Sequence, residues 1–592
     1  MTPPPHPDAS PPPRAPASLV YPWLGLVCAL LAAALAHSLI SGMKTIADLF
    51  LVEQDLPALL IAALLLLAWR FTPLPAPSGW LGRVGKRRPG PTLAALALFA
   101  ALVGVAGWFA VAGRYPLSMD EFMATFDARI FATGQPLASV PAEWQEFVPA
   151  LQPFFRSIPQ QHALWSSDYL PVSAAFRTLF TAVHAQGLLG AAWSGVAVIA
   201  TFGVGRRLWP DRPGAALLAA GLVATSAQVL AAGMTDYAMP AHLALNMVWL
   251  WLFLRRDRPS QAAAALTAFA ACGLHQVIFH PLFAAPFVLQ AWLERRWGKA
   301  AFHTAAYALI GLFWMSYWGL ALRMSGAELA TTPAGGPADF IAKSLHLVEM
   351  FEPMKLGWMP KNLLRFVAWQ NPISIVLCLA AVVPAWRAGG VWRSLILGVA
   401  LLIFAACFLM PFQGHGWGYR YLHGFIGSVA LLAAFGWIHL TRAGSGLDRR
   451  ILTPGLAIGF TGAVVILLPL HVFQMSMLIR PYAAAYAAIA RTDADVVLVD
   501  SAGLFYADDL VRNDPLLIAR PKILDLAALT PEQVPRLCAG RKLALFDRGL
   551  GLAYGLRATM AVTRPDVTAV RAALKDPGCR VERVPGPVFT ES

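Results

Sequence analysis

The sequence predicts an all-α polytopic membrane protein that ends in a small α/β domain. Of its 592 residues, 58% are hydrophobic and 13% are charged, whereas a soluble domain has roughly 45–50% apolar and about 25% charged residues. Many apolar runs approach about 20 residues, the length that a helix needs to cross a bilayer. This composition excludes a soluble globular enzyme, a disordered protein and a disulfide-framework mini-protein.

The apolar runs predict about thirteen membrane spans. They lie near 19–41, 56–69, 93–113, 187–205, 214–232, 239–254, 261–278, 280–293, 301–321, 372–386, 394–411, 421–440 and 452–475. The segments 56–69 and 280–293 are short, which is typical of tilted, broken or re-entrant helices. With these bounds the spans contain no Asp, Glu, Lys or Arg. An ion-coupled transporter is therefore disfavoured, because it needs a buried group that binds the ion.

The distribution of basic residues predicts the topology. Lys and Arg cluster in alternate loops, at 70–88, 206–212, 255–258, 295–299, 387–393 and 442–450. This bias places the N-terminus and these loops in the cytoplasm, and it explains the net charge of +14 without a nucleic-acid partner. The proline-rich tail 1–18 is predicted to be disordered, and 19–480 to form the transmembrane domain. Two long loops, 114–186 and 322–371, then lie outside.

The C-terminal segment 481–592 is predicted to be a small extracytoplasmic α/β domain. Short apolar runs at 496–500, 522–525 and 542–546 predict strands between helix-like stretches. Cys538 and Cys579 also lie in this segment. A disulfide between them would fit an oxidising compartment, but two cysteines alone leave their pairing open.

The first long loop begins with an acidic pair, Asp120 and Glu121, directly after a predicted span. Apolar residues follow at 119, 122, 123, 126 and 130, the spacing of an amphipathic helix at the membrane surface. Asp127 would share a face of this helix with Asp120, and it is a candidate for substrate binding. Glu121 is a second candidate catalytic residue, although a capping box with Ser118 would be a purely structural role for it. Asp120 lies where a lipid-borne substrate would present its headgroup.

This arrangement resembles the GT-C superfamily of membrane glycosyltransferases, especially the protein O-mannosyltransferases and the lipid A aminoarabinose transferases. Members carry an Asp-Glu pair on a surface helix that opens the first large extracytoplasmic loop, as Asp120 and Glu121 do here. The architectural resemblance covers roughly 93–480. It implies a polyprenyl-phosphate-linked sugar donor and a catalytic carboxylate at Asp120, and we expect a bacterial cytoplasmic (inner) membrane protein. The residues at 122–127 depart from the aminoarabinose transferase pattern, so the sugar and the acceptor (glycan, lipid or protein) stay open.

Further candidate residues for substrate binding lie in the outer loops. They are Asp168, Tyr169, Asp236, Tyr237, His275 and His280. Each has a structural alternative: an interfacial aromatic belt for Tyr169, a helix N-cap for Asp236, and satisfied polar residues at a helix break for the histidines. The two histidines do not make a zinc site, which needs three or four ligands.

The densest polar run is at 413–423. It supplies the candidates His415, Tyr419, Arg420 and His423, and its glycines let the backbone approach a ligand closely. An arginine that snorkels to the interface is the structural alternative for Arg420.

These residues suggest a mechanism. Asp120 would accept the proton of the acceptor hydroxyl, and Arg420, aided by His415 or His423, would stabilise the departing lipid phosphate. Direct attack would invert the sugar, and a divalent metal is not required. The alternatives are a flippase or exporter of lipid-linked sugars, an O-antigen ligase or polymerase, and a sensor or assembly protein.

Overall fold

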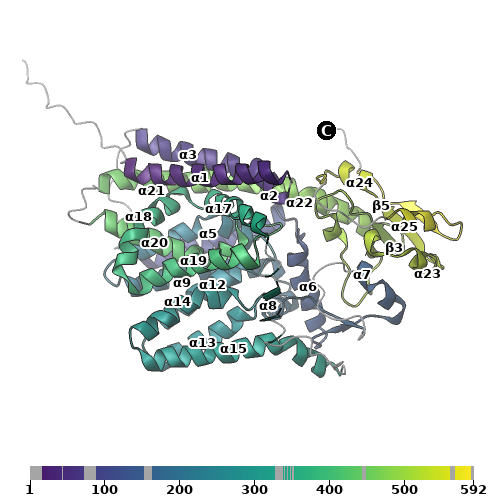
Figure 1. The fold of residues 1–592 in the computed structure, drawn as a ribbon, viewed down its shortest axis with the longest axis horizontal. Coiled ribbons are helices and arrows are strands. Elements are labelled where there is room, and N and C mark those ends of the chain that lie inside the picture. The colour runs from purple at the N-terminus through teal and green to yellow at the C-terminus, as the bar shows by residue number, and fades with distance from the viewer. Residues whose placement is uncertain are drawn as a thin grey trace, which may run out of the picture.

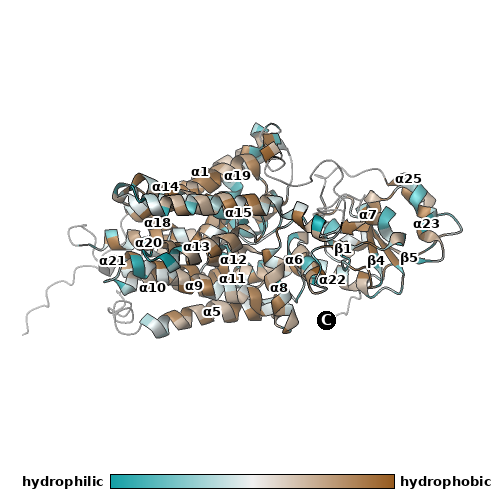
Figure 2. Ribbon diagram, turned by 90° about the horizontal axis from the view of Figure 1, so that it is seen from below, coloured by the Kyte–Doolittle hydropathy of each residue, from teal (hydrophilic) through white to brown (hydrophobic). Residues whose placement is uncertain are grey.

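The computed structural model describes residues 17–42, 45–71, 89–151, 163–326, 352–442, 449–559 and 567–587, with a few isolated residues between 327 and 351. A long helical bundle lies beside a small α/β unit, and α22 (Leu468–Ala490) runs from one into the other (Figure 1). The bundle helices are predominantly hydrophobic (Figure 2). The predicted disordered tail falls largely outside the described residues, and its last two residues begin α1.

The chain is a multi-pass membrane protein with fewer spans than the sequence predicts. Eight of the described helices are long and apolar enough to cross a membrane. They are Ala17–Ser41 (α1), Ile46–Phe71 (α2, η1 and α3), Pro89–Ala110 (α5), Gln186–Leu208 (η4 and α9), Trp297–Met324 (α15), Gly390–Leu409 (α19), Arg420–Leu440 (η6 and α20) and Leu452–Ala490 (α21, η7 and α22).

Two bent helix pairs raise the number to ten if each pair counts as one span. Pro213–Ala224 (α10) and Ala227–Gly233 (α11) meet at 58°, and Pro353–Ala368 (η5 and α17) meets Pro372–Ala388 (α18) at 116°. The other predicted spans are α12 (Met239–Phe253), α13 (Arg258–Cys272) and α14 (Phe279–Leu293). Each of these has 15 residues and is therefore about 22 Å long, less than the ~30 Å apolar thickness of a bilayer. Among the described residues the structure therefore supports eight to ten candidate spans, against the roughly thirteen that the sequence predicts.

The first helical hairpin departs from the prediction in a second way. The span predicted at 56–69 is part of a helix that starts at Ile46 and includes Asp55, whose side chain is only 2% exposed. Arg365 of α17, in the predicted outer loop 322–371, forms an ion pair with Asp55 at 3.1 Å. The expectation of uncharged spans is therefore wrong for this helix. The segment Pro353–Ala368 folds back into the bundle, where its cations neutralise carboxylates of the hairpin.

The first long loop contains the predicted amphipathic helix, α6 (Met119–Phe131). Two short antiparallel strands follow it, β1 (Ala138–Ser139) and β2 (Leu164–Trp165), with η2 (Ala142–Phe147) and α7 (Val148–Leu151) between them. The loop ends with α8 (Val172–Ala182) and η4 (Gln186–Leu188). The apolar residues of α6 at 119, 122, 123, 126 and 130 are all buried. They belong to the same hydrophobic cluster as strand residues of the α/β unit. Protein, rather than lipid, therefore covers the apolar face of α6.

The C-terminal unit is a four-stranded parallel sheet in the order β4-β3-β5-β6. Its strands are β3 (Val496–Val499), β4 (Lys522–Asp525), β5 (Lys542–Phe546) and β6 (Arg580–Arg583). The helices α23 (Val534–Cys538), α24 (Arg548–Ala553) and α25 (Thr568–Ala573) connect or flank them, with short 3-10 turns at Leu526–Ala528 and Pro531–Gln533. The three predicted strands are confirmed. Sequence reasoning missed β6, which is an exposed edge strand rich in Arg and Glu.

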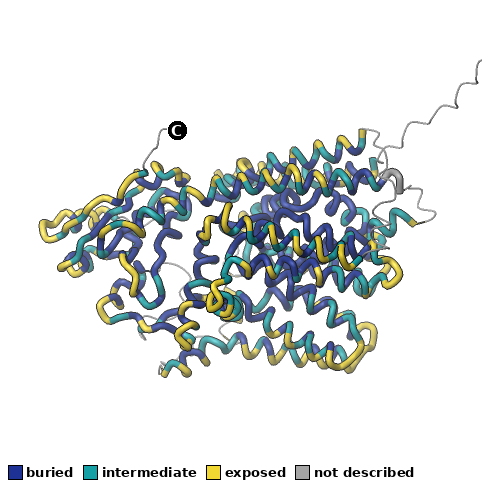
Figure 3. The backbone as a smooth tube through the Cα atoms, turned by 180° about the vertical axis from the view of Figure 1, so that it is seen from behind, coloured by how far each residue is buried: buried dark blue, intermediate teal, exposed yellow. Residues whose placement is uncertain are grey.

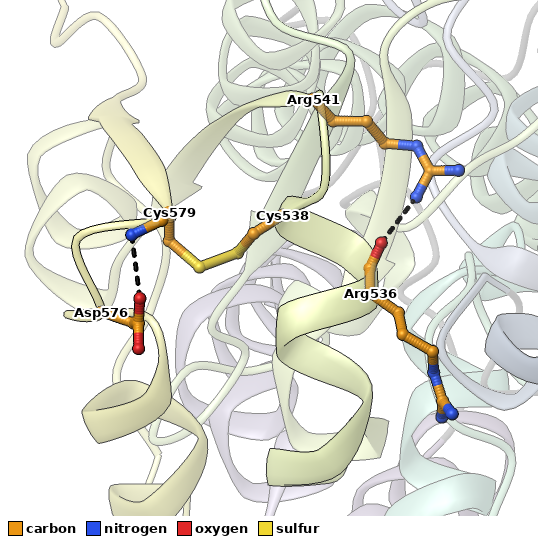
Figure 4. The surroundings of a disulfide bond; sticks show 6 residues. Arg536, Cys538, Arg541, Asp576 and Cys579 are labelled. Carbon is orange, nitrogen blue, oxygen red and sulfur yellow. Dashed lines mark hydrogen bonds between the residues drawn. A yellow bond between two sulfur atoms is a disulfide. The ribbon is translucent and has the colours of Figure 1, made fainter.

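A disulfide joins Cys538 to Cys579, with 5.0 Å between their Cα atoms (Figure 4). It ties the end of α23 to the residue that precedes β6, across 41 residues of sequence. The pairing that the sequence left open is therefore present. The interior of the bundle and the inner strands of the sheet are buried (Figure 3).

Candidate functional site

The site lies at the end of the bundle that faces the α/β unit, where α6 begins (Figure 1). Ser118 caps α6, because its hydroxyl oxygen accepts a hydrogen bond from the Glu121 N–H at 3.3 Å. This cap fixes the first turn, from which Asp120 projects. Arg420 begins η6 (Arg420–Phe425), at the start of another membrane helix. Both residues sit at helix ends, so the fold can bring them together although 300 residues separate them.

Asp120 and Arg420 form an ion pair between Oδ2 and Nη1, and the Tyr169 hydroxyl donates a hydrogen bond to Asp120 Oδ1. The contact between the predicted base and the predicted phosphate-binding arginine is thus present. Burial opposes ionisation of Asp120, but the Arg420 charge and the Tyr169 hydroxyl outweigh it and hold the carboxyl pKa below its ordinary value. Asp120 is therefore an ionised carboxylate at neutral pH.

Tyr169 and His275 complete the wall around Asp120. Their rings are stacked with centroids 3.9 Å apart. Burial and the Arg420 charge lower the pKa of His275 to about 4, against the opposite pull of Asp120. His275 is therefore neutral at pH 7, and its ring nitrogens can bond to a ligand without adding charge.

A narrow cleft with a volume of about 10 Å³ lies beside this group, lined by Asp120, Asp127, Tyr169, Tyr237 and His275 among others. A second cleft of about 10 Å³ is lined by Arg420, His242, Asn246 and Phe279 among others. Met239, at the start of α12, lines both pockets. The Asp120–Arg420 pair therefore lies between two narrow clefts, with Asp120 lining one and Arg420 lining the other.

Tyr237 lies under the arginine. The guanidinium carbon of Arg420 is 5.1 Å from the centroid of its ring. A cation over an aromatic face is stabilised by the ring quadrupole. Tyr237 therefore stabilises one face of the guanidinium.

Glu121 and Asp236 occupy a separate buried cluster. Glu121 Oε2 accepts a hydrogen bond from the Asp236 N–H at 3.1 Å, and Asp236 forms an ion pair with Arg177 at 2.8 Å. Burial and the neighbouring Asp236 carboxylate raise the pKa of Glu121 to about 8. Glu121 thus connects α6 to the turn before α12 instead of completing a capping box. Asp236 is not a helix N-cap, since Ala238 holds that position.

Asp127 of α6 contacts the loop that carries Asp168 and Tyr169. Asp127 accepts hydrogen bonds from the Ser167 N–H, at 2.9 Å, and from the Ser167 hydroxyl. Burial, with a contribution from Asp168, raises the pKa of Asp127 to about 7. Asp168 itself is exposed. Asp127 therefore fixes the loop beneath Tyr169, although it also lines the pocket.

The remaining predicted residues are buried elsewhere. His280 lies within α14, where Nδ1 is 2.7 Å from Asn246 Oδ1 and Nε2 is 2.9 Å from the Tyr307 hydroxyl. His423 is buried in η6, and Tyr419 is buried just before it. None of the three lines either pocket. Satisfied polar contacts inside the bundle account for His280.

His415 faces the α/β unit. Its Nε2 is 3.2 Å from Asp509 Oδ2, and its ring centroid is 3.7 Å from that of Tyr506. Asp509 lies in η8 (Ala507–Leu510), which follows Tyr506 directly. His415 therefore connects the glycine-rich run to the C-terminal unit and does not line the Asp120 pocket.

Sequence reasoning missed the residues that hold the glycine-rich run in place. Gln413 Oε1 accepts a hydrogen bond from the Arg420 N–H at 2.8 Å, and its amide donates to the Gly418 carbonyl at 3.2 Å. Arg365 donates to the carbonyls of Gly416, at 2.5 Å, and Gly418, at 3.2 Å. Gly416 has φ +135°, and a Cβ there would lie 2.2 Å from Arg420 Cδ. Gln413 lies in the polar run 413–423 that the sequence singled out. Arg365 lies in the segment 322–371, which the sequence predicted to be an outer loop.

A second missed residue, Arg512, reaches α6 from the C-terminal unit. It donates to the carbonyls of Pro116 and Leu117, the latter at 2.7 Å, and its guanidinium carbon is 4.3 Å from the Tyr115 ring centroid. The C-terminal unit thereby fixes the chain just before Asp120. A lone arginine in a polar segment gave no signal for this contact.

Within the described part of the chain, no three His, Cys, Asp or Glu side chains gather closely enough to hold a metal ion. No family model matches the chain, and no curated protein matches it either. Solved structures do match. They are membrane glycosyltransferases of the GT-C kind, at low sequence identity.

ArnT from Cupriavidus metallidurans, solved bound to undecaprenyl phosphate, is 12% identical, with a TM-score of 0.45 over 83% of this chain and 90% of ArnT. The same protein in the apo state gives a TM-score of 0.46 over 75% of this chain. The archaeal oligosaccharyltransferase AglB from Archaeoglobus fulgidus, in complex with an inhibitory peptide and a dolichol-phosphate, is 12% identical with a TM-score of 0.41. This chain spans 58% of the length of that oligosaccharyltransferase as solved with a tethered acceptor peptide, with a TM-score of 0.41.

Proposed function

We propose that this protein is a membrane glycosyltransferase that moves a sugar from a polyprenyl-phosphate donor to an acceptor hydroxyl at the extracytoplasmic face. One observation carries the proposal: an ionised carboxylate, Asp120, is held by Arg420 and Tyr169 between two small pockets at one end of a membrane bundle. A general base and a phosphate-binding cation are the two groups that this reaction needs. The disulfide in the C-terminal unit supports an oxidising, extracytoplasmic location for that end.

In this mechanism the acceptor oxygen attacks the anomeric carbon, and the bond from that carbon to the phosphate oxygen breaks. The acceptor proton goes to Asp120, and the polyprenyl phosphate leaves with the bonding electrons. Attack from the face opposite to the phosphate inverts the configuration at the anomeric carbon. Tyr169 and Arg420 hold Asp120 ionised and aimed, so the proton acceptor is in place before the substrate binds.

Arg420 would bind the departing phosphate. Its Nη1 contacts Asp120 and its Nη2 contacts the Gln413 carbonyl, while Nε has no hydrogen-bond partner among the residues that the structure describes. A guanidinium can bridge a carboxylate and a phosphate, because it presents five N–H donors in a fixed fork. The guanidinium would thereby stabilise the charge that develops on the leaving phosphate, in a site with little water.

The direct test is to incubate the purified protein with a panel of polyprenyl-phosphate sugars and short acceptor alcohols, and to measure the release of lipid phosphate. We expect release with at least one sugar, together with a glycosylated acceptor of inverted configuration. The matched control is Asp120→Asn, which keeps the size of the side chain and removes the base. Release at equal rates from both proteins would remove the transferase proposal.

A flippase for lipid-linked sugars is the second candidate, because the Asp120–Arg420 pair could hold a lipid phosphate without cleaving it. Charged residues inside membrane proteins often mark transport pathways. The two functions differ in outcome. A flippase moves a fluorescent lipid-linked sugar between the leaflets of a vesicle without cleaving it, whereas a transferase releases lipid phosphate on one side.

A further inference from the structure

We propose that a groove between α9 and α12, at the end of the bundle away from Asp120, binds the headgroup and upper acyl chain of an anionic phospholipid. The groove is open to one side and has a volume of about 610 Å³. It adjoins a hollow of about 460 Å³ that shares Arg207 and Arg255 with it. This inference is independent of the proposed transferase activity.

The groove is distant from the site described above. Helix α12 begins at Met239, which lines the Asp120 pocket, and runs for 15 residues before the turn that carries Arg255. At a rise of about 1.5 Å per residue, this places the mouth of the groove roughly 22 Å from the pocket, with Val248 on its wall about 14 Å away. Figure 1 shows α6 and α8 at one end of the bundle and α21 at the other. A ligand in the groove therefore does not compete with the donor or the acceptor.

The walls of the groove are apolar along the membrane helices. Ile199, Val248 and Trp251 line it, and Ile199 is 50% exposed. Trp251 lies against Gly203, because a Cβ at that glycine would be 3.1 Å from the indole nitrogen. The indole thus packs into the space that the glycine leaves, beside an exposed aliphatic side chain. An acyl chain fits such a surface, whereas a soluble anion gains nothing from it.

The mouth of the groove is cationic. Arg206, Arg207 and Arg255 line it, and Arg256 lines the adjoining hollow. Arg206 donates to the Pro210 carbonyl at 2.5 Å, and the Arg255 guanidinium carbon is 4.5 Å from the Trp251 ring centroid. These contacts hold the two guanidinium groups at the rim, above the apolar wall.

The protein balances the positive charge at this mouth only in part, because Asp257, which lines the adjoining hollow, attracts Arg255 without pairing with it. Across the part of the chain that the structure describes, none of these four arginines forms an ion pair with a carboxylate. The Asp257 carboxylate beside them caps α13 by accepting from the Ser260 N–H at 2.9 Å. Charge complementarity therefore selects an anion, and the apolar wall below selects one that carries a hydrocarbon chain.

The test is native mass spectrometry of the full chain in detergent, titrated with short-chain phosphatidylglycerol, phosphatidylcholine or glycerol phosphate. We expect the wild type to bind phosphatidylglycerol at least about tenfold more tightly than phosphatidylcholine, because each nearby arginine contributes severalfold. The double variant Arg207→Gln/Arg255→Gln should lose roughly that tenfold preference. The single variant Arg207→Glu, at an exposed side chain, should weaken binding in the same direction.

The matched control is Arg387→Gln/Arg442→Gln, which removes the same charge from exposed arginines outside the groove. We expect it to change binding by less than about twofold. Equal losses in both double variants would show diffuse attraction and overturn the proposal. Equal binding of phosphatidylcholine would show that the groove binds lipid without selecting an anionic headgroup. Displacement of the lipid by an equal concentration of glycerol phosphate would indicate a site for a soluble anion instead. Either result also overturns it.

Discussion

Two buried arginine–aspartate pairs lie in different regions of this molecule and are built differently. Arg365 and Asp55, inside the bundle, are saturated: Arg365 Nη1 bonds both Asp55 oxygens, at 3.1 and 3.2 Å, and Trp369 Nε1 donates to Asp55 at 3.1 Å. The remaining guanidinium donors go to Gln54 and to backbone carbonyls. Arg420 and Asp120, at the end of the bundle, border two pockets, and Arg420 Nε has no described partner.

The number of satisfied hydrogen bonds distinguishes the inner ion pair, which is structural, from the outer pair, which can bind a ligand. A buried ion pair stabilises only when further hydrogen bonds satisfy both partners, and the inner pair meets this condition with a side chain of Asp55 that is 2% exposed. The outer pair leaves a donor open and an Asp120 side chain that is 14% exposed. A ligand can complete the outer pair, whereas nothing remains to be completed at the inner one.

The largest expected effect comes from comparing Asp120→Asn with Asp127→Asn. Asp120 is ionised, so its amide variant loses the proton acceptor, and transfer should fall about a thousandfold. Burial raises the pKa of Asp127 to about 7, so an amide resembles its protonated form, and transfer should change by less than about threefold. The measurement is initial-rate release of lipid phosphate at pH 7.

Equal losses in these two variants would contradict the assignment of Asp120 as the base. They would instead indicate that the loop beneath Tyr169 controls the activity. Donor binding, measured separately by native mass spectrometry, should persist in Asp120→Asn, because Arg420 remains.

The next largest effect concerns stability. Arg365→Met leaves the buried Asp55 carboxylate unpaired and removes the donors to Gly416 and Gly418, so unfolding should become easier by about 3–5 kcal/mol. Arg420→Met should cost about 1–3 kcal/mol, because Asp120 keeps the Tyr169 hydroxyl and partial exposure. Denaturant unfolding in micelles, followed by tryptophan fluorescence, makes this comparison.

A matched double variant sharpens the test of the inner pair. Arg365→Met with Asp55→Leu removes both charges, and replacement of a buried pair by apolar residues is often close to neutral. We expect most of the stability lost in the single variant to return. No recovery would mean that the bonds of Arg365 to the glycine-rich run, rather than its charge pairing, carry its contribution.

A smaller effect is expected for Arg420→Lys. Lysine keeps the charge but lacks the planar fork that can hold Asp120 and a phosphate together. The loss of one charge-assisted hydrogen bond should reduce kcat/KM for the donor roughly tenfold to a hundredfold. Steady-state kinetics with varied donor measures this. If the loss appeared in KM for the acceptor and not for the donor, Arg420 would have a different role.

Much of the fold was predictable, because hydrophobic length and periodicity are local properties of the sequence. Each long apolar run is helical in the structure, and the short runs at 496–500, 522–525 and 542–546 form strands. The number of spans was not predictable, since it depends on where helices bend and end. The chain turns by 116° between α17 and α18, at Asn371 and Pro372, and a count of apolar residues does not register such a turn.

The site was predictable only in part. Asp120, Tyr169, Tyr237, His275 and Arg420 were recognised as polar residues next to membrane spans, and the structure brings them together. Their roles remain predictions. Arg365 and Arg512 were missed because their partners are distant backbone carbonyls and carboxylates. Contacts that depend on tertiary structure leave no local pattern in the sequence.

The smallest effect concerns Glu121. Among the described residues, no cation lies within hydrogen-bond distance of its carboxylate. Burial and Asp236 raise its pKa from 4.5 to about 8. As the pH rises through this range, the unfolded chain releases the proton first, so wild-type stability should fall between about pH 4.5 and pH 8.

Glu121→Gln cannot titrate, and its amide oxygen can still accept from the Asp236 N–H. The melting temperature of the variant relative to wild type should therefore rise by roughly 2–4 °C from pH 5 to pH 8, and exposed Glu143→Gln should show no such trend. A difference that stayed flat, or that grew toward low pH, would mean that Glu121 is ionised in the folded protein and that the Asp120 site has a second charge beside it.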